Sequence, residues 1–215
     1  METKTFSENP PAAAGSLKER QRQERVELIL EAAEEVMAEK GYYEMSMDEI
    51  AARVGIAKGT IYLHFPGKED LFIALFKRGL TSFLSGIARI ASQPLSATER
   101  LKLILMQAYD EHRKKQSQVF MAVFSGGNMR KETVLKQLQM REYLKELASY
   151  ISKILEDGKA TGEFDGSIQT SVMLTAFLSL LNRPHYEEML GEASFSAEEL
   201  ADQVGRVYLH GISGK

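Results

Sequence analysis

Small, basic and aromatic side chains alternate in the stretch VGIAKGTIYLHFPGKEDLF, which spans residues 54–72. Arg53, Lys58 and Lys68 are cations in this part of the chain, and no acidic residue lies between positions 50 and 68. Lysine ammonium groups and the hydroxyls of threonine and tyrosine bind phosphate oxygens, and glycine allows a close backbone approach. These residue types indicate a surface for a polyanion, although the whole chain carries a formal net charge of −3.

Glycines and apolar spacing divide this stretch into short helices. Ser46 and Glu49 have the spacing of a capping box, which begins a helix that Gly55 ends. A second short helix follows over about 57–64, and a proline–glycine pair ends it. Two short helices joined by a glycine-containing turn, with a longer helix on each side, predict a helix-turn-helix over about 46–65. The spacing by itself fits an ordinary helical hairpin equally well.

Side-chain chemistry favours a DNA-reading unit over such a hairpin. Thr60 can contact a thymine methyl group or a phosphate, and Tyr62 offers a ring that ends in a hydroxyl. Lys68 lies in the first turn of the next helix, where the helix dipole disfavours a cation. A phosphate bound between Lys68 and the helix amides would remove this conflict, and a solvated surface lysine is the simpler alternative.

Residues 22–82 resemble the DNA-binding domain of the TetR family of bacterial transcriptional repressors. The resemblance rests on ILEAAEEVMAEKGYYEMSMDEIAARVGIAKGTIYLHFPGKEDLF, above all on its run GTIYLHF and on the lysine that opens the next helix. It implies a homodimer that binds a double-stranded DNA operator. The DNA contacts that it implies are Ser46, Lys58, Gly59, Thr60, Tyr62, His64 and Lys68.

The second helix of the predicted helix-turn-helix, over about 57–64, is called the reading helix below. Two of its residues depart from the family's usual pattern. Ala57 replaces a frequent serine, and Leu63 stands where a polar or aromatic residue is common. Because of these two differences, the operator sequence of this protein cannot be inferred from the operators of the family. His64 also fits a different interpretation, in which a half-buried imidazole binds a backbone carbonyl instead of a phosphate.

The helical patterns predict an all-α protein of about nine helices. We expect a flexible polar tail over 1–20, a DNA-binding domain over 22–82, and a C-terminal domain over 83–215 that includes a long helix at about 131–156. The chain has no cysteine, and no apolar run approaches the ~18 residues of a membrane span. Because the N-terminus also lacks the pattern of a signal peptide, we expect a cytoplasmic protein with no membrane partner.

Residue patterns of an enzyme are not found in the sequence. The four histidines show no metal-ligand spacing, and there is neither a phosphate-binding loop nor a nucleophile elbow. Asp110 and Glu111 adjoin His112, but adjacent helical residues point to different faces. We expect no enzyme activity, metal or cofactor. The remaining alternative is a helical protein-binding adaptor that retains a helix-turn-helix without binding an operator.

The segment 168–181 is apolar almost all round, so its helix must be covered on both sides. The same helix of a second subunit is the simplest cover. The resemblance extends this dimer interface to the last two long helices, at about 168–181 and 197–211.

The resemblance also implies a pocket for a small-molecule inducer that releases the repressor from a palindromic operator. The side chains that we expect near this pocket are Met106, Tyr109, His112, Phe120, Phe124, Met140, Tyr143, Met173 and Phe177. Ordinary core packing is the alternative for most of them, because apolar stripes usually only pack.

Overall fold

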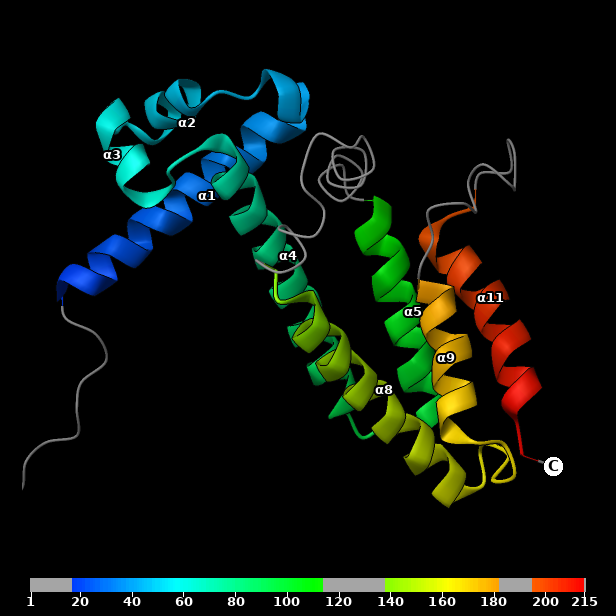
Figure 1. The fold of residues 1–215 in the computed structure, drawn as a ribbon. Helices are drawn as coiled ribbons and strands as arrows, with labels where there is room; N and C mark the ends of the chain where they lie inside the picture. Colours follow the sequence, from blue (N-terminus) through cyan, green and yellow to red (C-terminus); the bar gives the residue numbers. More distant parts are fainter. Residues whose placement is uncertain (1–16, 114–137, 182–194, 215) are drawn as a thin grey trace, which may run out of the picture.

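The computed structural model describes residues 17–113, 138–181 and 195–214, and this part of the chain is built from helices (Figure 1). The helices are α1 (Leu17–Glu44), α2 (Met47–Val54), α3 (Lys58–His64), α4 (Lys68–Ala91), α5 (Ala97–Arg113), α8 (Met140–Thr161), α9 (Thr170–Leu181) and α11 (Ala197–Ile212). The all-α prediction is confirmed.

Helix boundaries differ from the sequence-based expectations at two places. Helix α1 begins at Leu17, so the expected tail is too long by residues 17–20, where lysine, glutamate and arginine are good helix formers. Helix α8 continues beyond 156 to Thr161 and ends only at Gly162, which adopts the left-handed conformation with φ 79°. The expected helical residues 131–137 lie outside the described part of the chain.

One apolar cluster joins α1, α2, α3 and the first half of α4. Ile61 of α3 and Ile50 of α2 have no exposed surface, and Phe65 after α3 is 7% exposed. Val54 and Ile56 pack against the same cluster while partly buried. The predicted helix-turn-helix is therefore present, with its apolar side chains in one core, which we call the N-terminal cluster.

A second apolar cluster joins α5, α8, α9 and α11 with the second half of α4, and we call it the C-terminal cluster. Two tyrosine hydroxyls from this cluster donate to backbone carbonyls. Tyr109 bonds the oxygen of Leu180 at 3.1 Å, and Tyr208 bonds that of Met173 at 2.7 Å. Each tyrosine thus buries its ring while its hydroxyl donates a hydrogen bond to a backbone carbonyl of α9.

Helix α4 belongs to both clusters and connects them (Figure 1). Its residues Leu71, Phe72 and Leu75 lie in the N-terminal cluster, whereas Ile87 and Ile90 lie in the C-terminal one. By length and composition α4 would also be able to cross a membrane, a test that core helices of water-soluble proteins pass as well. One continuous helix is therefore packed in both clusters.

Candidate nucleic-acid interface and effector groove

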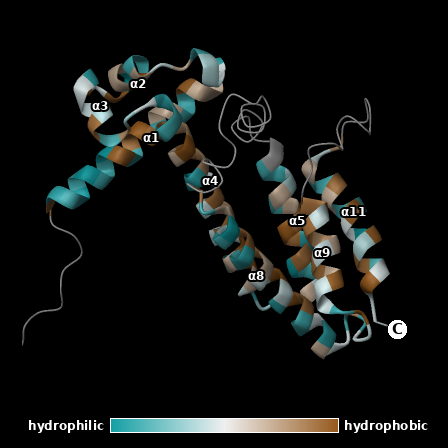
Figure 2. Cartoon of the chain, in the orientation of Figure 1, coloured by the Kyte–Doolittle hydropathy of each residue, from teal (hydrophilic) through white to brown (hydrophobic). Residues whose placement is uncertain are grey.

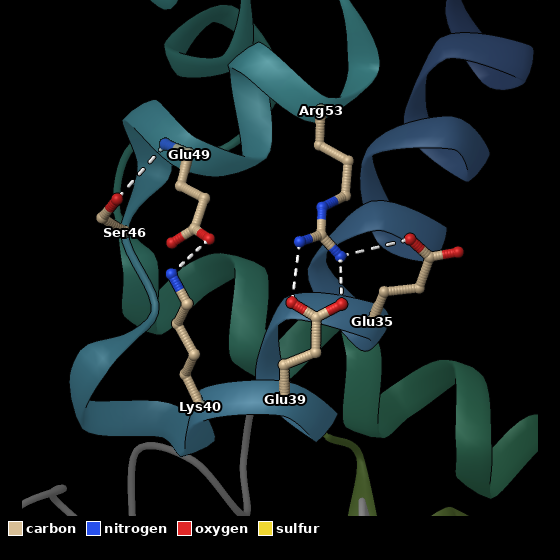
Figure 3. Close-up of polar contacts among 6 residues, drawn as sticks. All are labelled: Glu35, Glu39, Lys40, Ser46, Glu49 and Arg53. Carbon is tan, nitrogen blue, oxygen red and sulfur yellow. Dashed lines mark hydrogen bonds and ion pairs between the residues drawn. The ribbon is translucent and has the colours of Figure 1, made fainter.

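The local signals around the turn position helix α2. The amide of Glu49 donates to Ser46 Oγ at 3.2 Å, so Ser46 caps α2 as predicted. The carboxylate of Glu49 does not complete the predicted capping box, because it accepts from Lys40 Nζ at 2.7 Å (Figure 3). A cation within reach provides a stronger, charge-assisted bond than a backbone amide does. Gly55 ends the helix in the left-handed region with φ 75°.

Helix α3 presents one buried and one exposed side. Ile61 fixes it to the N-terminal cluster, while Tyr62 is 42% exposed and Leu63 is 80% exposed on the outer side. Lys58 and Gly59 are exposed as well. Outside its own stretch of helix, a methyl group added at Gly59 would meet no atom of the described residues within 4 Å, so another molecule can approach the α3 backbone closely there. Thr60, by contrast, is half-buried.

The cations of this region are paired with acids from other helices. Lys58 Nζ lies 2.7 Å from Asp48 Oδ2. Arg53 donates two hydrogen bonds of 2.8 Å to Glu39 and a longer one to Glu35 (Figure 3). These hydrogen bonds raise the pKa of both Lys58 and Arg53. The stretch that is free of acids in the sequence is therefore locally neutralised in the fold, and Arg53 serves to join α2 to α1.

Lys68 has partners within the protein, although its place in the first turn of α4 is unfavourable for a cation. Its Nζ donates to the carbonyl oxygen of Tyr43 at 2.9 Å and lies 4.6 Å from the centroid of the Tyr42 ring. Burial lowers the pKa of Lys68. A phosphate is thus not required to explain this lysine. Since an ammonium group has three N–H donors, a DNA contact by Lys68 stays a prediction.

His64 ends helix α3. Its Nδ1 is buried and has no hydrogen-bond partner among the described residues, which gives no support to a carbonyl bond at that atom. Burial lowers the pKa of His64, and the positive charges of Arg22 and Arg25 lower it further. Both effects favour the neutral form of the imidazole, and the charges of two arginines of α1 reach it. The sequence pattern did not indicate this neighbourhood.

A groove of about 320 Å³ lies between α4 and α8. Its lining residues are Lys77, Leu80, Thr81, Leu84, Ser85, Ala88, Leu138, Gln139, Glu142, Tyr143, Glu146 and Tyr150. Leucine side chains provide apolar walls, and two glutamates and a lysine are the charged residues of the lining. It is a candidate site for a small molecule with an apolar part.

Among the residues expected in an inducer pocket, Tyr143 lines this groove. Tyr109, Met173 and Phe177 instead pack in the C-terminal cluster with at most 1% of their surface exposed. Their helical spacing reflects core packing, which gives the same pattern as a pocket wall. Met106 is 39% exposed, and Met140 packs against the N-terminal cluster. Phe120, Phe124 and the side chain of His112 lie outside the described residues.

Two contacts lead from the helices around the groove to the N-terminal cluster and to α1. Leu138, which lines the groove just before α8, is 3% exposed and belongs to the N-terminal cluster. Arg78 of α4 forms ion pairs with Glu34 and, at 3.6 Å, with Glu27, both on α1. Helix α4 and the start of α8 are therefore both in contact with the N-terminal cluster or with α1.

Comparisons with known proteins agree with this architecture. Residues 29–75 match the family model described as bacterial regulatory proteins, tetR family. The fatty acid metabolism regulator protein of Bacillus subtilis (strain 168) is 25% identical over 191 residues, which cover 87% of this chain and 95% of that protein.

Solved structures extend the similarity to the C-terminal helices. A transcriptional regulator of the TetR/AcrR family from Thermobifida fusca YX-ER1 superposes with a TM-score of 0.72 at 27% identity, over 87% of this chain and 98% of the other. The regulator FadR of Bacillus subtilis, in complex with stearoyl-CoA, has the same fold, with a TM-score of 0.66 at 23% identity over 86% and 98% of the two chains. The likeness thus includes both apolar clusters.

Proposed function

Because the chain belongs to the TetR family of bacterial regulatory proteins, it is a DNA-binding transcription regulator, and we propose that it is a repressor released from a palindromic operator by a small-molecule inducer. The observation that carries this proposal is the exposed side of α3, where Gly59 faces open space beside Lys58 and Tyr62. A rigid helix with such a surface can enter the major groove of DNA.

The residues proposed to contact the operator are Ser46, Lys58, Gly59, Thr60, Tyr62, His64 and Lys68. Tyr62 and Lys58 are exposed and carry groups that bind phosphate. Leu63, which is 80% exposed on the same helix, adds an apolar group that can contact a thymine methyl. Thr60 is half-buried at the edge of this surface, a position suited to one base edge or one phosphate.

We propose that the homodimer forms through α9 and α11. Val172 on α9 is 57% exposed and Val207 on α11 is 80% exposed, which is unusual for valines unless a partner covers them. The other exposed residues of α9 are small, namely Ser171, Thr175, Ala176 and Ser179. Small residues let two helices pack closely. A two-fold dimer places two α3 helices for the two halves of a palindrome.

The dimer proposal is tested by sedimentation of Val207→Glu. A buried, unpaired carboxylate at the centre of the interface should turn the dimer into monomers. Lys145→Gln, at an exposed site on α8, also makes the charge more negative by one unit and should leave a dimer. A Val207→Glu protein that remains dimeric at micromolar concentration would place the interface elsewhere.

We propose the α4–α8 groove as the inducer site and a long-chain acyl compound as the first candidate. The apolar walls formed by Leu80, Leu84 and Leu138 suit an alkyl chain, and the Bacillus subtilis relative is named for fatty acid metabolism. A ligand that prefers a wider groove would draw α4 and α8 apart. Through Arg78 and Leu138 this change would reach the N-terminal cluster and alter the spacing of the α3 helices.

A gel-shift titration on the protein's own promoter fragment tests this function. Wild-type protein should retard the fragment at low salt, and stearoyl-CoA should release it. Ser85→Trp fills the groove and should abolish the response to stearoyl-CoA, whereas Ser82→Trp, exposed on α4 outside the groove, should retain it.

Each negative outcome has a different meaning. Equal responses of both tryptophan variants would remove the groove as the inducer site. If no acyl compound changed the affinity for DNA, the inducer class would be wrong. Protein that never retards the fragment would favour the adaptor alternative.

A further inference from the structure

Helix α1 extends beyond the part that builds the N-terminal cluster. Residues 17–25 are all exposed, and even the apolar Leu17 has 74% of its surface in contact with solvent. The buried face of α1 begins only at Ile29. Figure 1 shows these first turns, in dark blue, running away from α2 and α3, and Figure 2 shows that they are mainly hydrophilic. This extension is not explained by the packing of the cluster.

The extension carries more positive than negative charge. Its cations are Lys18, Arg20, Arg22 and Arg25, and its acids are Glu19 and Glu24. Residues four and three apart share one face of a helix, so Lys18, Arg22 and Arg25 form a stripe. Arg20 is half a turn away from that stripe. The helix therefore presents one basic face.

This basic face continues the helix α1, which packs in the N-terminal cluster with Ile61 and Phe65 of the reading helix and its end. The charges of Arg22 and Arg25 act on the imidazole of His64, the last residue of α3. Both arginines precede the buried stretch of α1 that is fixed against α2 and α4, so their position relative to α3 is set by the N-terminal cluster. A duplex that contacts α3 would therefore lie close to them.

The two arginines are also less engaged by the protein itself than the cations around α3. Arg53 and Lys58 bind carboxylates, as described above, and Lys68 binds a carbonyl. Arg22 has only Glu19 at 3.9 Å, with both side chains about 60% exposed, and Arg25 forms no ion pair with a described residue. Their charge is available to an external anion.

We infer that the Lys18–Arg22–Arg25 face of α1 binds the sugar–phosphate backbone of the operator beside the groove that α3 reads. Its occupant is duplex DNA, because the basic face is complementary to phosphate charge and adjoins the proposed DNA-contacting surface. This inference rests on the proposed function. The inference adds a second DNA contact to the proposed function. This contact is independent of sequence and supplies affinity without discriminating between bases.

The test compares the full-length variants Arg22→Ala/Arg25→Ala and Arg20→Ala. Binding to operator and scrambled duplexes is measured by fluorescence anisotropy at several salt concentrations. The double variant should weaken binding to both duplexes by the same factor. It should also reduce the slope of log K against log salt by about 0.9 for each phosphate that the variant no longer neutralises. Arg20→Ala, on the opposite face, should behave as wild type.

Controls separate loss of charge from loss of structure. Arg22→Lys/Arg25→Lys should restore the slope, and circular dichroism should show unchanged helix content and melting for all variants. An unchanged salt slope in the double alanine variant, with wild type still binding, would overturn the inference and leave the proposed function intact. A loss confined to the operator would also overturn it, because that result would mean base reading. Failure of wild type to bind either duplex would instead refute the proposed function.

Discussion

The N-terminal and C-terminal clusters are held together by different polar interactions. Around the N-terminal cluster, side chains such as Arg53, Lys40 and Arg78 form ion pairs between separate helices near the surface. In the C-terminal cluster the polar contacts are sheltered. Tyr208 is buried, and Arg100, which is 8% exposed, bonds Asp157 at 3.0 Å and the carbonyl of Ala91.

This difference determines how each region responds to change. Exposed ion pairs contribute little to stability and are screened by salt, so the N-terminal region can exchange its internal partners for DNA phosphates. Close packing dominates the C-terminal cluster, where a single added methyl group changes the stability of the fold. Substitutions should therefore affect DNA binding in the first region and stability in the second.

The largest effect is expected from Gly158→Ala in α8. An added Cβ would overlap the ring of Phe164 and lie 2.8 Å from the Cβ of Ala97. Overpacking of this kind costs about 1–3 kcal/mol, so the free energy of unfolding in urea should fall by that amount. A variant as stable as wild type would show that the end of α8 and the start of α5 can separate without cost.

Gly59→Ala makes the same substitution in the other region. The position is helical and open, so stability should be kept or rise by about 0.5–1 kcal/mol, because alanine is the better helix former. The affinity for operator DNA should fall about tenfold, or about 1.4 kcal/mol, since the methyl group would lie between α3 and the duplex. Unchanged DNA binding would show that this side of α3 does not approach DNA closely.

Lys68→Met separates the two roles of that lysine. It keeps most of the aliphatic stem but removes the bond to the carbonyl of Tyr43, which should cost about 1 kcal/mol of stability. If Lys68 also contacts a phosphate, the salt slope should fall by about one unit on operator and scrambled DNA alike. Lower stability with an unchanged slope would leave Lys68 as a structural residue only.

Asp48→Asn should strengthen DNA binding. The carboxylate pairs with Lys58 at 2.7 Å, and both side chains are more than half exposed, so folding stability should change little. Releasing Lys58 should raise the affinity for any duplex a few-fold and steepen the salt dependence by about one unit. Asp110 is an exposed carboxylate on α5, and Asp110→Asn should change neither quantity.

The smallest effect is expected from Glu163→Gln, measured against pH. Although burial opposes it, hydrogen bonds from the amides of Thr98 and Ala97, at 2.9 and 3.1 Å, lower the pKa of Glu163. A carboxylate with a lower pKa in the folded than in the unfolded protein stabilises the fold at pH values above its unfolded pKa, about 4.5. This contribution to stability is lost as the pH falls through the lower, folded pKa. Wild type should therefore exceed the variant in urea stability at pH 7, and the difference should shrink at pH 4. A difference independent of pH would contradict this.

The helix-turn-helix could be predicted because its signals are local. Ser46, Gly55 and the buried pair Ile61 and Phe65 fix its ends, turn and inner face within a few residues of each other. The second half of the capping box failed for a non-local reason, since Lys40 on another helix binds Glu49. The complete capping box of Ser196 and Glu199 at the start of α11 was not anticipated, although the same local pattern would have shown it.

The groove that we propose as the inducer site could not be predicted from apolar spacing. Tyr109 and Phe177 repeat at helical intervals, but the fold places them inside the C-terminal cluster. The groove is formed where α4 and α8, far apart in sequence, run alongside each other, and polar residues such as Glu142 and Thr81 line it. A helical period shows which face is apolar but not which helix will cover it.

The sequence by itself determined the helices, the turn between α2 and α3, and the exposed side of the reading helix, because caps, glycines and apolar periods act over a few residues. Only the tertiary structure decided which acids neutralise Arg53 and Lys58, that Leu138 enters the N-terminal cluster, and that the charges of Arg22 and Arg25 lower the pKa of His64. These relations depend on distances between helices. Such distances follow from the packing of whole clusters, and no local pattern encodes them.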